Sequence, residues 1–317
     1  MKQILFAVAV LTMGLTISQS YHLQLLTFIG IHTILALGLN MLMGYAGQIS
    51  LGHAAFYGLG AYATGILTAH WGWSPWAALP VALAGTFVVA FLVALPMLKL
   101  SGYYLGMGTL GFGMIAFIVF REWSSLTGGD SGLVGIPSLT VGTFSVSSGK
   151  PYFFLVWGCV LLAFIACERL VDSRVGRALR AIHDSEKAAA AMGIDTSRLK
   201  IWVFVFSAVL AGLAGFLYAH LVTFISPNSF GFLVSIRIVT MVVIGGMASI
   251  WGSLLGAAVL TILPDWLHVF TDYEMVVYGL ILMAIMIFVP QGLTRGILDT
   301  YERSRRKAFT TPDPSQS

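Results

Sequence analysis

A stretch of nearly one hundred residues near the start of the chain carries no charged side chain. Between Gln3 and Leu98 there is no Asp, Glu, Lys or Arg, and the first carboxylate of the whole sequence is Glu122. A soluble domain has about a quarter of its residues charged, whereas this chain has 9% charged and 58% hydrophobic residues. Because a bilayer core about 30 Å thick takes about 20 apolar residues per helix, the sequence predicts an all-α polytopic membrane protein.

The apolar segments predict about 8–10 transmembrane helices in a single transmembrane domain over residues 1–317. The long apolar run 232–264 is interrupted by GGMASIWG (Gly245–Gly252). We expect two spans there, and leave open that one of them is re-entrant. The first segment also has features of a signal peptide, but we expect an uncleaved helix. The predicted segments are 3–19, 23–43, 48–69, 77–98, 103–120, 152–167, 201–224, 232–246, 250–264 and 275–290.

Basic residues predict the orientation of these spans. Residues 168–200 and the tail 291–317 together contain 12 of the 17 Lys and Arg residues. Loops rich in Lys and Arg stay in the cytoplasm, so both stretches are predicted to be cytoplasmic, with both chain termini inside and residues 122–151 outside. The net charge of +4 therefore reflects topology, and no nucleic-acid partner is expected. Trp71, Trp73, Trp76 and Trp266 then fall near the outer interface.

The stretch GYAGQISLGHAAFYGLGAY (Gly44–Tyr62) combines glycine with neutral polar residues inside an apolar region. Small residues let membrane helices pack closely, and neutral polar residues can line a path without the cost of a buried charge. Two glycines near its start suggest a broken helix or a sharp turn. Tight packing alone would also explain the composition. The candidate pathway or packing residues are Gly44, Gly47, Gln48, Ser50, Gly52, His53 and Tyr57.

The loop 168–200 is predicted to contain a short helix outside the membrane. Asp184 or Ser185 can cap its N-terminus, and Glu186 then lies in its first turn, where the helix dipole favours an acid. Four alanines that include Ala189 and Ala190 continue the helix, and Gly193 ends it. A short helix with an alanine face fits a groove in a partner protein, whereas a solvated loop that only sets topology is the alternative.

Several chemistries have no motif in this sequence. There is no GxxxxGK[ST] for ATP, no zinc signature and no catalytic serine, histidine and acid in a recognisable order, so no metal or catalytic site is expected. Ion-coupled transporters usually carry an intramembrane acid, and the first five segments contain none. Arg237 lies within a predicted span and either extends to the interface or is paired inside. An ion-coupled secondary transporter or a channel for small polar solutes is the alternative class.

Several segments resemble the permease subunits of branched-chain amino acid ABC importers of the LivM type. The resemblance is carried by Gly44–Tyr62, by TGGDSGLVGIP (Thr127–Pro137), by RALRAIHDSEKAAAAMGID before Thr196, and by ISPNSFGFLVSI and VVIGGMASIWGSLLGAA further on. These motifs occur in order over nearly the whole chain. One departure is that Ser131, rather than an acid, precedes Gly132.

The resemblance implies an ABC-importer permease fold in a bacterial inner membrane. It implies that residues 168–200 form the coupling loop, with Asp184, Ser185, Glu186, Ala189, Ala190 and Gly193 at the contact with an ATPase. The implied partners are a homologous second permease, two ABC ATPase subunits, a periplasmic substrate-binding protein and membrane lipid. This chain would bind no cofactor, and ATP and Mg would be held by the ATPase chains. Relatives that carry urea, amides or aromatic amino acids leave the solute open.

Overall fold

The fold is a bundle of helices joined by short connections. The computed structural model describes residues 2–17, 19–97, 100, 102–141, 144–146 and 149–267, together with Gly279, Leu280, Met283 and Ile287. The predicted segment 275–290 and the tail 291–317 therefore lie almost entirely outside the described residues. The α-helices are α1 (Lys2–Thr16), α2 (Ser20–Asn40), α3 (His53–Ala69), α4 (Pro75–Met97), α5 (Tyr103–Glu122), α6 (Ser124–Thr127), α7 (Lys150–Asp172), α8 (Arg174–Asp184), α9 (Glu186–Ala191), α10 (Thr196–Val222), α11 (Phe232–Gly245) and α12 (Ile250–Leu267).

Shorter elements complete the described part of the chain. A π-helical turn η1 (Met41–Tyr45) extends α2, and the 3-10 turns η2 (Gly129–Ser131) and η3 (Pro227–Phe230) precede β1 and α11. Strand β1 (Leu133–Val134) pairs antiparallel with β4 (Phe224–Ile225), and β2 (Leu139–Val141) pairs with β3 (Phe144–Val146). These strands are only two or three residues long, so the predicted all-α class is confirmed.

Among the residues that the structure describes, six helical segments are long and apolar enough to cross a membrane. Shorter apolar helices cover Phe6–Thr16 and Ile250–Trp266, and α3 has 17 residues. The prediction of a polytopic membrane protein is thereby confirmed for the part of the chain that the structure describes. Three boundaries were wrong. The segment expected from residue 48 becomes helical only at His53, the helix expected to end at 167 continues to Asp172, and the helix expected from 201 already begins at Thr196. The six spans are Ser20–Tyr45, Pro75–Met97, Tyr103–Glu122, Lys150–Asp172, Thr196–Val222 and Pro227–Gly245.

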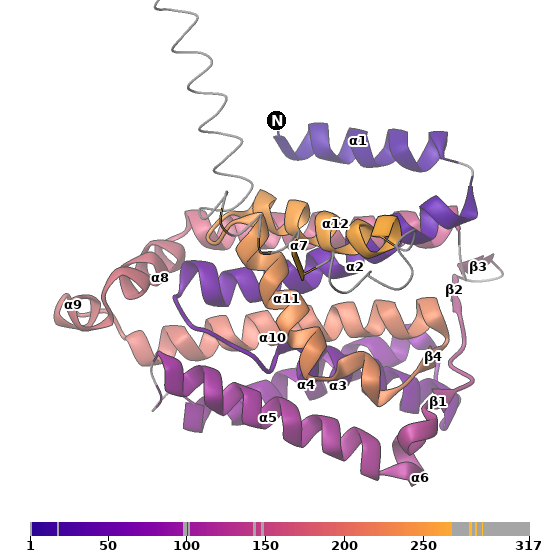
Figure 1. Cartoon of the computed structure of the whole chain (residues 1–317), viewed down its shortest axis with the longest axis horizontal. Helices are drawn as coiled ribbons and strands as arrows, with labels where there is room; N and C mark the ends of the chain where they lie inside the picture. The colour runs from indigo at the N-terminus through magenta and orange to yellow at the C-terminus, as the bar shows by residue number, and fades with distance from the viewer. Residues whose placement is uncertain are drawn as a thin grey trace, which may run out of the picture.

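Helix α10 occupies the centre of the bundle. It packs against α2, α3 and α4, and Figure 1 shows it running the length of the molecule between these helices. Close approach of α3 and α10 depends on glycine. A Cβ atom on Gly60 would lie 2.2 Å from the carbonyl oxygen of Gly212, and one on Gly215 would lie 2.1 Å from the carbonyl oxygen of Tyr57. The predicted role of glycine in helix packing is therefore confirmed for this pair.

The predicted break between the two late spans is confirmed. Helix α11 ends at Gly245 and α12 begins at Ile250, with Gly246 and Ala248 at positive φ. The two helices then pack closely against each other, since a Cβ atom on Gly256 would lie 1.9 Å from the carbonyl oxygen of Met241. They are thus two separate helices that share an interface.

The two ends of the bundle gather different loops. At the end that carries α8 and α9, here called the α9 end, Gly47 lies against His183, and the amide of Ala248 donates to Asn40 Oδ1 at 2.9 Å. Residues 46–52, 173–195 and 246–249 therefore share this end, and Figure 1 shows α9 extending beyond the bundle. The grouping agrees with the predicted segments, because an even number of spans separates each of these stretches from the next.

The opposite end, here called the β1 end, is closed by the segment after α6. The register of β1 and β4 pairs Leu133 with Ile225. His220 at the end of α10 contacts the carbonyl oxygen of Pro137 through Nδ1 at 2.7 Å and Thr64 Oγ1 through Nε2 at 3.1 Å. Helix α10 is thus held at this end by α3 and by the loop that follows β1.

Candidate functional site

The short helix predicted in the basic loop is present as α9. Ser185, rather than Asp184, is its N-cap, because the Ser185 hydroxyl accepts the amide of Ala188 at 3.3 Å, while Asp184 is the last residue of α8. A side-chain oxygen in this position satisfies one of the free amides of the first turn. The predicted start of the helix is confirmed, and the alternative cap Asp184 is wrong.

Gly193 ends this helix as predicted, through a Schellman motif. Its φ is +82°, a region that glycine enters without steric cost. The amide of Gly193 donates to the carbonyl of Ala190 at 3.0 Å, and the amide of Ile194 donates to the carbonyl of Ala189 at 3.1 Å. These two bonds are the pair that defines the motif. The cap, the alanines and the glycine therefore fix α9 locally as a compact unit.

The outer surface of α9 differs in detail from the predicted alanine face. Ala189 is 3% exposed and faces the protein, so it is unavailable to a partner, whereas Ala190 is exposed. Met192 at the helix end is 83% exposed and was not expected from the sequence. Methionine is a flexible apolar side chain that is common on protein-binding surfaces. The free face of α9 is therefore small and partly apolar.

An ion pair joins α9 to the central helix. Lys200 Nζ in the second turn of α10 contacts Glu186 Oε1 in the first turn of α9. The Lys200 side chain is only 7% exposed, whereas that of Glu186 is 42% exposed. From the sequence, Glu186 was expected to interact with the dipole of the short helix, and Lys200 was one of the basic residues of the loop 168–200. The structure instead buries Lys200 with Glu186 as its partner, so the two helices are linked by charge.

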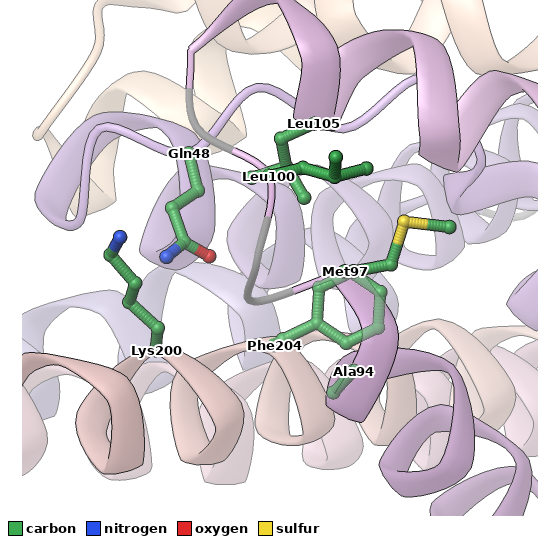
Figure 2. Close-up of a pocket in the computed structure, with 7 residues that line it drawn as sticks. All are labelled: Gln48, Ala94, Met97, Leu100, Leu105, Lys200 and Phe204. Atoms are coloured by element: carbon green, nitrogen blue, oxygen red, sulfur yellow. The ribbon is translucent and has the colours of Figure 1, made fainter.

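Gln48 lies beside this ion pair. Its side chain and that of Lys200 point toward the same small space of about 10 Å³, between the loop that precedes α3 and the start of α10. Figure 2 shows the two polar ends facing each other, with Met97, Leu105 and Phe204 around them. A volume of this size holds about one water molecule. Among the predicted pathway residues, Gln48 is thus the one that shares a space with Lys200, the partner of Glu186.

The other predicted residues of Gly44–Tyr62 lie in three different places. Gly44 packs on the 246–249 turn, where a Cβ atom would lie 2.3 Å from the amide of Ala248, and Gly52 packs on α5 against Thr109. The predicted break near Gly47 is confirmed, since its φ is +66°. Ser50 and His53 are buried, and Ser50 Oγ and His53 Nε2 have no hydrogen-bond partner among the described residues.

Tyr57 and Arg237 both line a cavity that the sequence did not predict. Its volume is about 270 Å³, and it lies between α2, α3, α10, η3 and α11. Arg237 is exposed, as expected of an arginine that reaches out of its span, and it also lines this cavity. No motif could have revealed the site, because each wall comes from a different element. The lining residues are Phe28, His32, Leu35, Tyr57, Tyr218, Ser229, Val234, Arg237, Ile238 and Met241.

The polar residues of the cavity are held by neighbours. His32 Nδ1 lies 2.8 Å from Thr261 Oγ1, which places α12 behind the α2 wall. The Tyr218 hydroxyl donates to Ser229 Oγ at 3.3 Å, and so connects α10 to η3. The rings of Tyr57 and Tyr218 are 5.4 Å apart. The cavity therefore has a preformed wall of aromatic and hydroxyl groups with one cation beside it.

Within the described residues, no cluster of three or more His, Cys, Asp or Glu side chains could hold a metal ion. A capped helix is tied by charge to a long central helix, and a cavity lies between the spans.

Comparison with known proteins gives the family. Residues 21–289 match the family described as "Branched-chain amino acid transport system / permease component". The chain belongs to this family, and it is accordingly a multi-pass membrane permease component of a transport system. It is 33% identical to the high-affinity branched-chain amino acid transport system permease protein LivM of Escherichia coli (strain K12), over 92% of this chain and 75% of that protein.

Two further relatives carry the same kind of name. The chain is 26% identical to LivH of Salmonella typhimurium, over 83% of this chain and 90% of that protein, and 25% identical to BraD of Pseudomonas aeruginosa, over 88% and 93%. Both are named high-affinity branched-chain amino acid transport system permease proteins. No solved structure matches the chain significantly. The resemblance noted in the sequence is therefore confirmed.

Proposed function

We propose that the chain is the membrane-spanning subunit of an ATP-driven importer in a bacterial inner membrane, and that it carries branched-chain amino acids. In this proposal a homologous second permease completes the membrane part, and two ATPase subunits that hold ATP and Mg dock at the α9 end. A periplasmic binding protein delivers the solute at the β1 end. The observation that carries the proposal is α9 itself, a capped helix beyond the bundle in a permease whose sequence has no nucleotide motif.

The proposed coupling follows the contacts of α9. ATP binding would close the ATPase dimer and displace α9 as a rigid unit, because its ends are fixed by Ser185 and Gly193. The Glu186–Lys200 ion pair would transfer this displacement to α10, which packs on α2, α3 and α4. Packed helices tend to switch between discrete arrangements. A movement at the α9 end would thus change access to the space between the spans.

Uptake by the reconstituted complex tests the proposal. The chain is co-expressed with its second permease and ATPase subunits, purified, and inserted into proteoliposomes with the binding protein and labelled L-leucine. We expect accumulation only with enclosed ATP and binding protein. Accumulation by the permease chains alone, driven by a sodium or proton gradient, would instead establish a secondary transporter or channel. Uptake of labelled urea, an amide or an aromatic amino acid under the same conditions, with no uptake of leucine, would assign another solute.

The orientation is a separate prediction. We expect α8 and α9 to be cytoplasmic and the segment after α6 to be outside, because basic residues are retained inside. Single cysteines at Lys187 and Ser138, in a background without Cys159 and Cys167, report the two sides while leaving the Ser185 cap in place. An impermeant thiol reagent applied to intact cells should label Ser138→Cys, and should label Lys187→Cys only after the cells are opened. Labelling in the reverse order would invert the topology.

A further inference from the structure

The cavity between α2, α3, α10 and α11 has a single charged residue in its wall. Of its ten lining residues, Arg237 is charged, His32, Tyr57, Tyr218 and Ser229 are polar, and the remaining five are apolar. None of the carboxylates that the structure describes forms an ion pair with Arg237. Arginine within a membrane span is costly and is usually paired or faces a water-filled space. Arg237 therefore offers an unpaired guanidinium to whatever occupies the cavity.

A guanidinium of this kind recognises a carboxylate. Its planar donors match the two oxygens of a carboxylate and bind them in parallel, more strongly than neutral groups do. The neighbouring polar groups are already occupied in part, since Tyr218 donates to Ser229 and His32 contacts Thr261. Arg237 is thus the group best placed to receive a negative charge, and the other polar side chains are better suited to hold the shape of the site.

The aromatic and apolar walls of the cavity fit the ammonium group and the side chain of an apolar amino acid. The rings of Phe28 and Tyr218 are 6.4 Å apart, and those of Tyr57 and Tyr218 are 5.4 Å apart. Aromatic faces in this arrangement attract an ammonium group, and Ile238 and Met241 add apolar surface. The volume of about 270 Å³ is slightly below the range of typical ligand pockets, which is about 300–1,000 Å³. The size therefore suits a small solute.

We propose that this cavity binds the transported solute, an α-amino acid with an apolar side chain, and that Arg237 binds its α-carboxylate. The inference rests on the proposed function for the identity of the solute. The site itself is assigned from the unpaired cation, the aromatic rings and the apolar wall. It places solute recognition in the permease, beside α11, in addition to any recognition by a binding protein.

Protection of a cysteine in the cavity tests the site directly. Val234 lines the cavity without a polar role, so Val234→Cys in the Cys159→Ala, Cys167→Ala background reports occupancy by its rate of thiol labelling. The purified complex is labelled with L-leucine or with leucinamide, which lacks the carboxylate. A hydrogen bond to a charged group changes the affinity by about 10- to 100-fold. We therefore expect leucine to halve the labelling rate at a concentration about 10- to 100-fold lower than leucinamide requires.

Arg237→Gln in the same background should remove that preference. The protein should assemble normally, because an exposed arginine adds little to folding in the membrane, while the leucine-to-leucinamide ratio should fall to about one. Arg237→Lys keeps the charge and should retain part of the preference. Thr240→Ala, on the same helix but outside the lining, is the matched control and should behave as the parent. An unchanged ratio in Arg237→Gln would overturn the assignment.

The remaining outcomes separate the site from the proposed function. Normal ATP-dependent leucine uptake without protection at Val234→Cys would overturn the site and leave the proposed function standing. Protection by leucine that depends on Arg237, in a complex that accumulates no leucine, would support the site and contradict the proposed function. If phosphatidylglycerol vesicles slow the labelling of Val234→Cys and leucine does not, Arg237 binds a lipid phosphate. That result would overturn the inference.

Discussion

Glu186→Lys should nearly abolish uptake while leaving the protein inserted in the membrane. The substitution removes the partner of the buried Lys200 and places a second cation beside it. The cost should be about 1–3 kcal/mol, between the values for exposed and buried pairs, because Glu186 is partly solvated. The spans do not depend on this contact, so the damage should remain at the link between α9 and α10.

The measurement is ATPase activity and leucine uptake in the same proteoliposomes. We expect uptake at least 10-fold below wild type, with ATPase subunits either lost on purification or hydrolysing ATP without transport. The charge-swapped double variant Glu186→Lys, Lys200→Glu should recover part of the uptake. Lys187→Glu, one residue away and exposed, is the control and should transport normally. Full uptake and normal ATPase stimulation in Glu186→Lys would show that α9 does not couple the ATPase to the spans.

Gly193→Val tests the same unit through its other end. The position has φ of +82° and open space around a Cβ atom, so only backbone strain should act there. A left-handed conformation costs an L-residue about 1–2 kcal/mol, and more for a β-branched one. Val should therefore displace α9 and reduce uptake, whereas Gly193→Asn, which tolerates this conformation, should retain it. Equal uptake in both variants would contradict the coupling role.

Gly60→Ala is expected to be strongly destabilising, although it adds only one methyl group. Its methyl group would lie 2.2 Å from the carbonyl oxygen and 2.5 Å from the Cα of Gly212, so α3 and α10 must separate. Overpacking in a close-packed core costs about 1–3 kcal/mol and sometimes more. Because backbone rather than a flexible side chain blocks the space, we expect the upper part of this range and a lower yield of folded complex.

Thermal unfolding in detergent gives the comparison, with Gly85→Ala as the matched control. Gly85 lies in α4 with no atom within 4 Å of an added Cβ, so alanine there should be neutral or stabilising by up to about 1 kcal/mol. Gly60→Ala should lower the midpoint by several degrees, at about 2–4 °C per kcal/mol for a chain of this size. Equal midpoints would show that α3 and α10 separate easily, contrary to their packing.

Much of the local structure was accessible from the sequence. The absence of charge over Gln3–Leu98 was enough to define a membrane protein, since no soluble surface can be built from such a segment. The cap at Ser185, the glycine at Gly193 and the break at Gly245–Gly252 were also predicted and confirmed. Each signal acts within a few residues of backbone, through hydrogen bonds and steric limits that the neighbouring sequence specifies.

The contacts between distant residues were not accessible in this way. In the sequence, Lys200 is one of several basic residues of a loop, and Arg237 is an isolated arginine in a span. In the structure, Lys200 pairs with Glu186, and Arg237 lines a cavity. Nothing in the sequence linked His32, Tyr218 and Ser229 to one another, because their shared cavity depends on how separate helices pack.

The membrane class, the positions of most helices and the short helix α9 thus follow from the sequence. Hydrophobicity, capping and glycine conformation are properties of the residue and its neighbours. The ion pair between α9 and α10, and the cavity with one arginine between four helices, follow instead from the packing of the whole chain. Those features depend on distances between elements, and membrane helices, with little hydrophobic force between them, set these distances by side-chain packing.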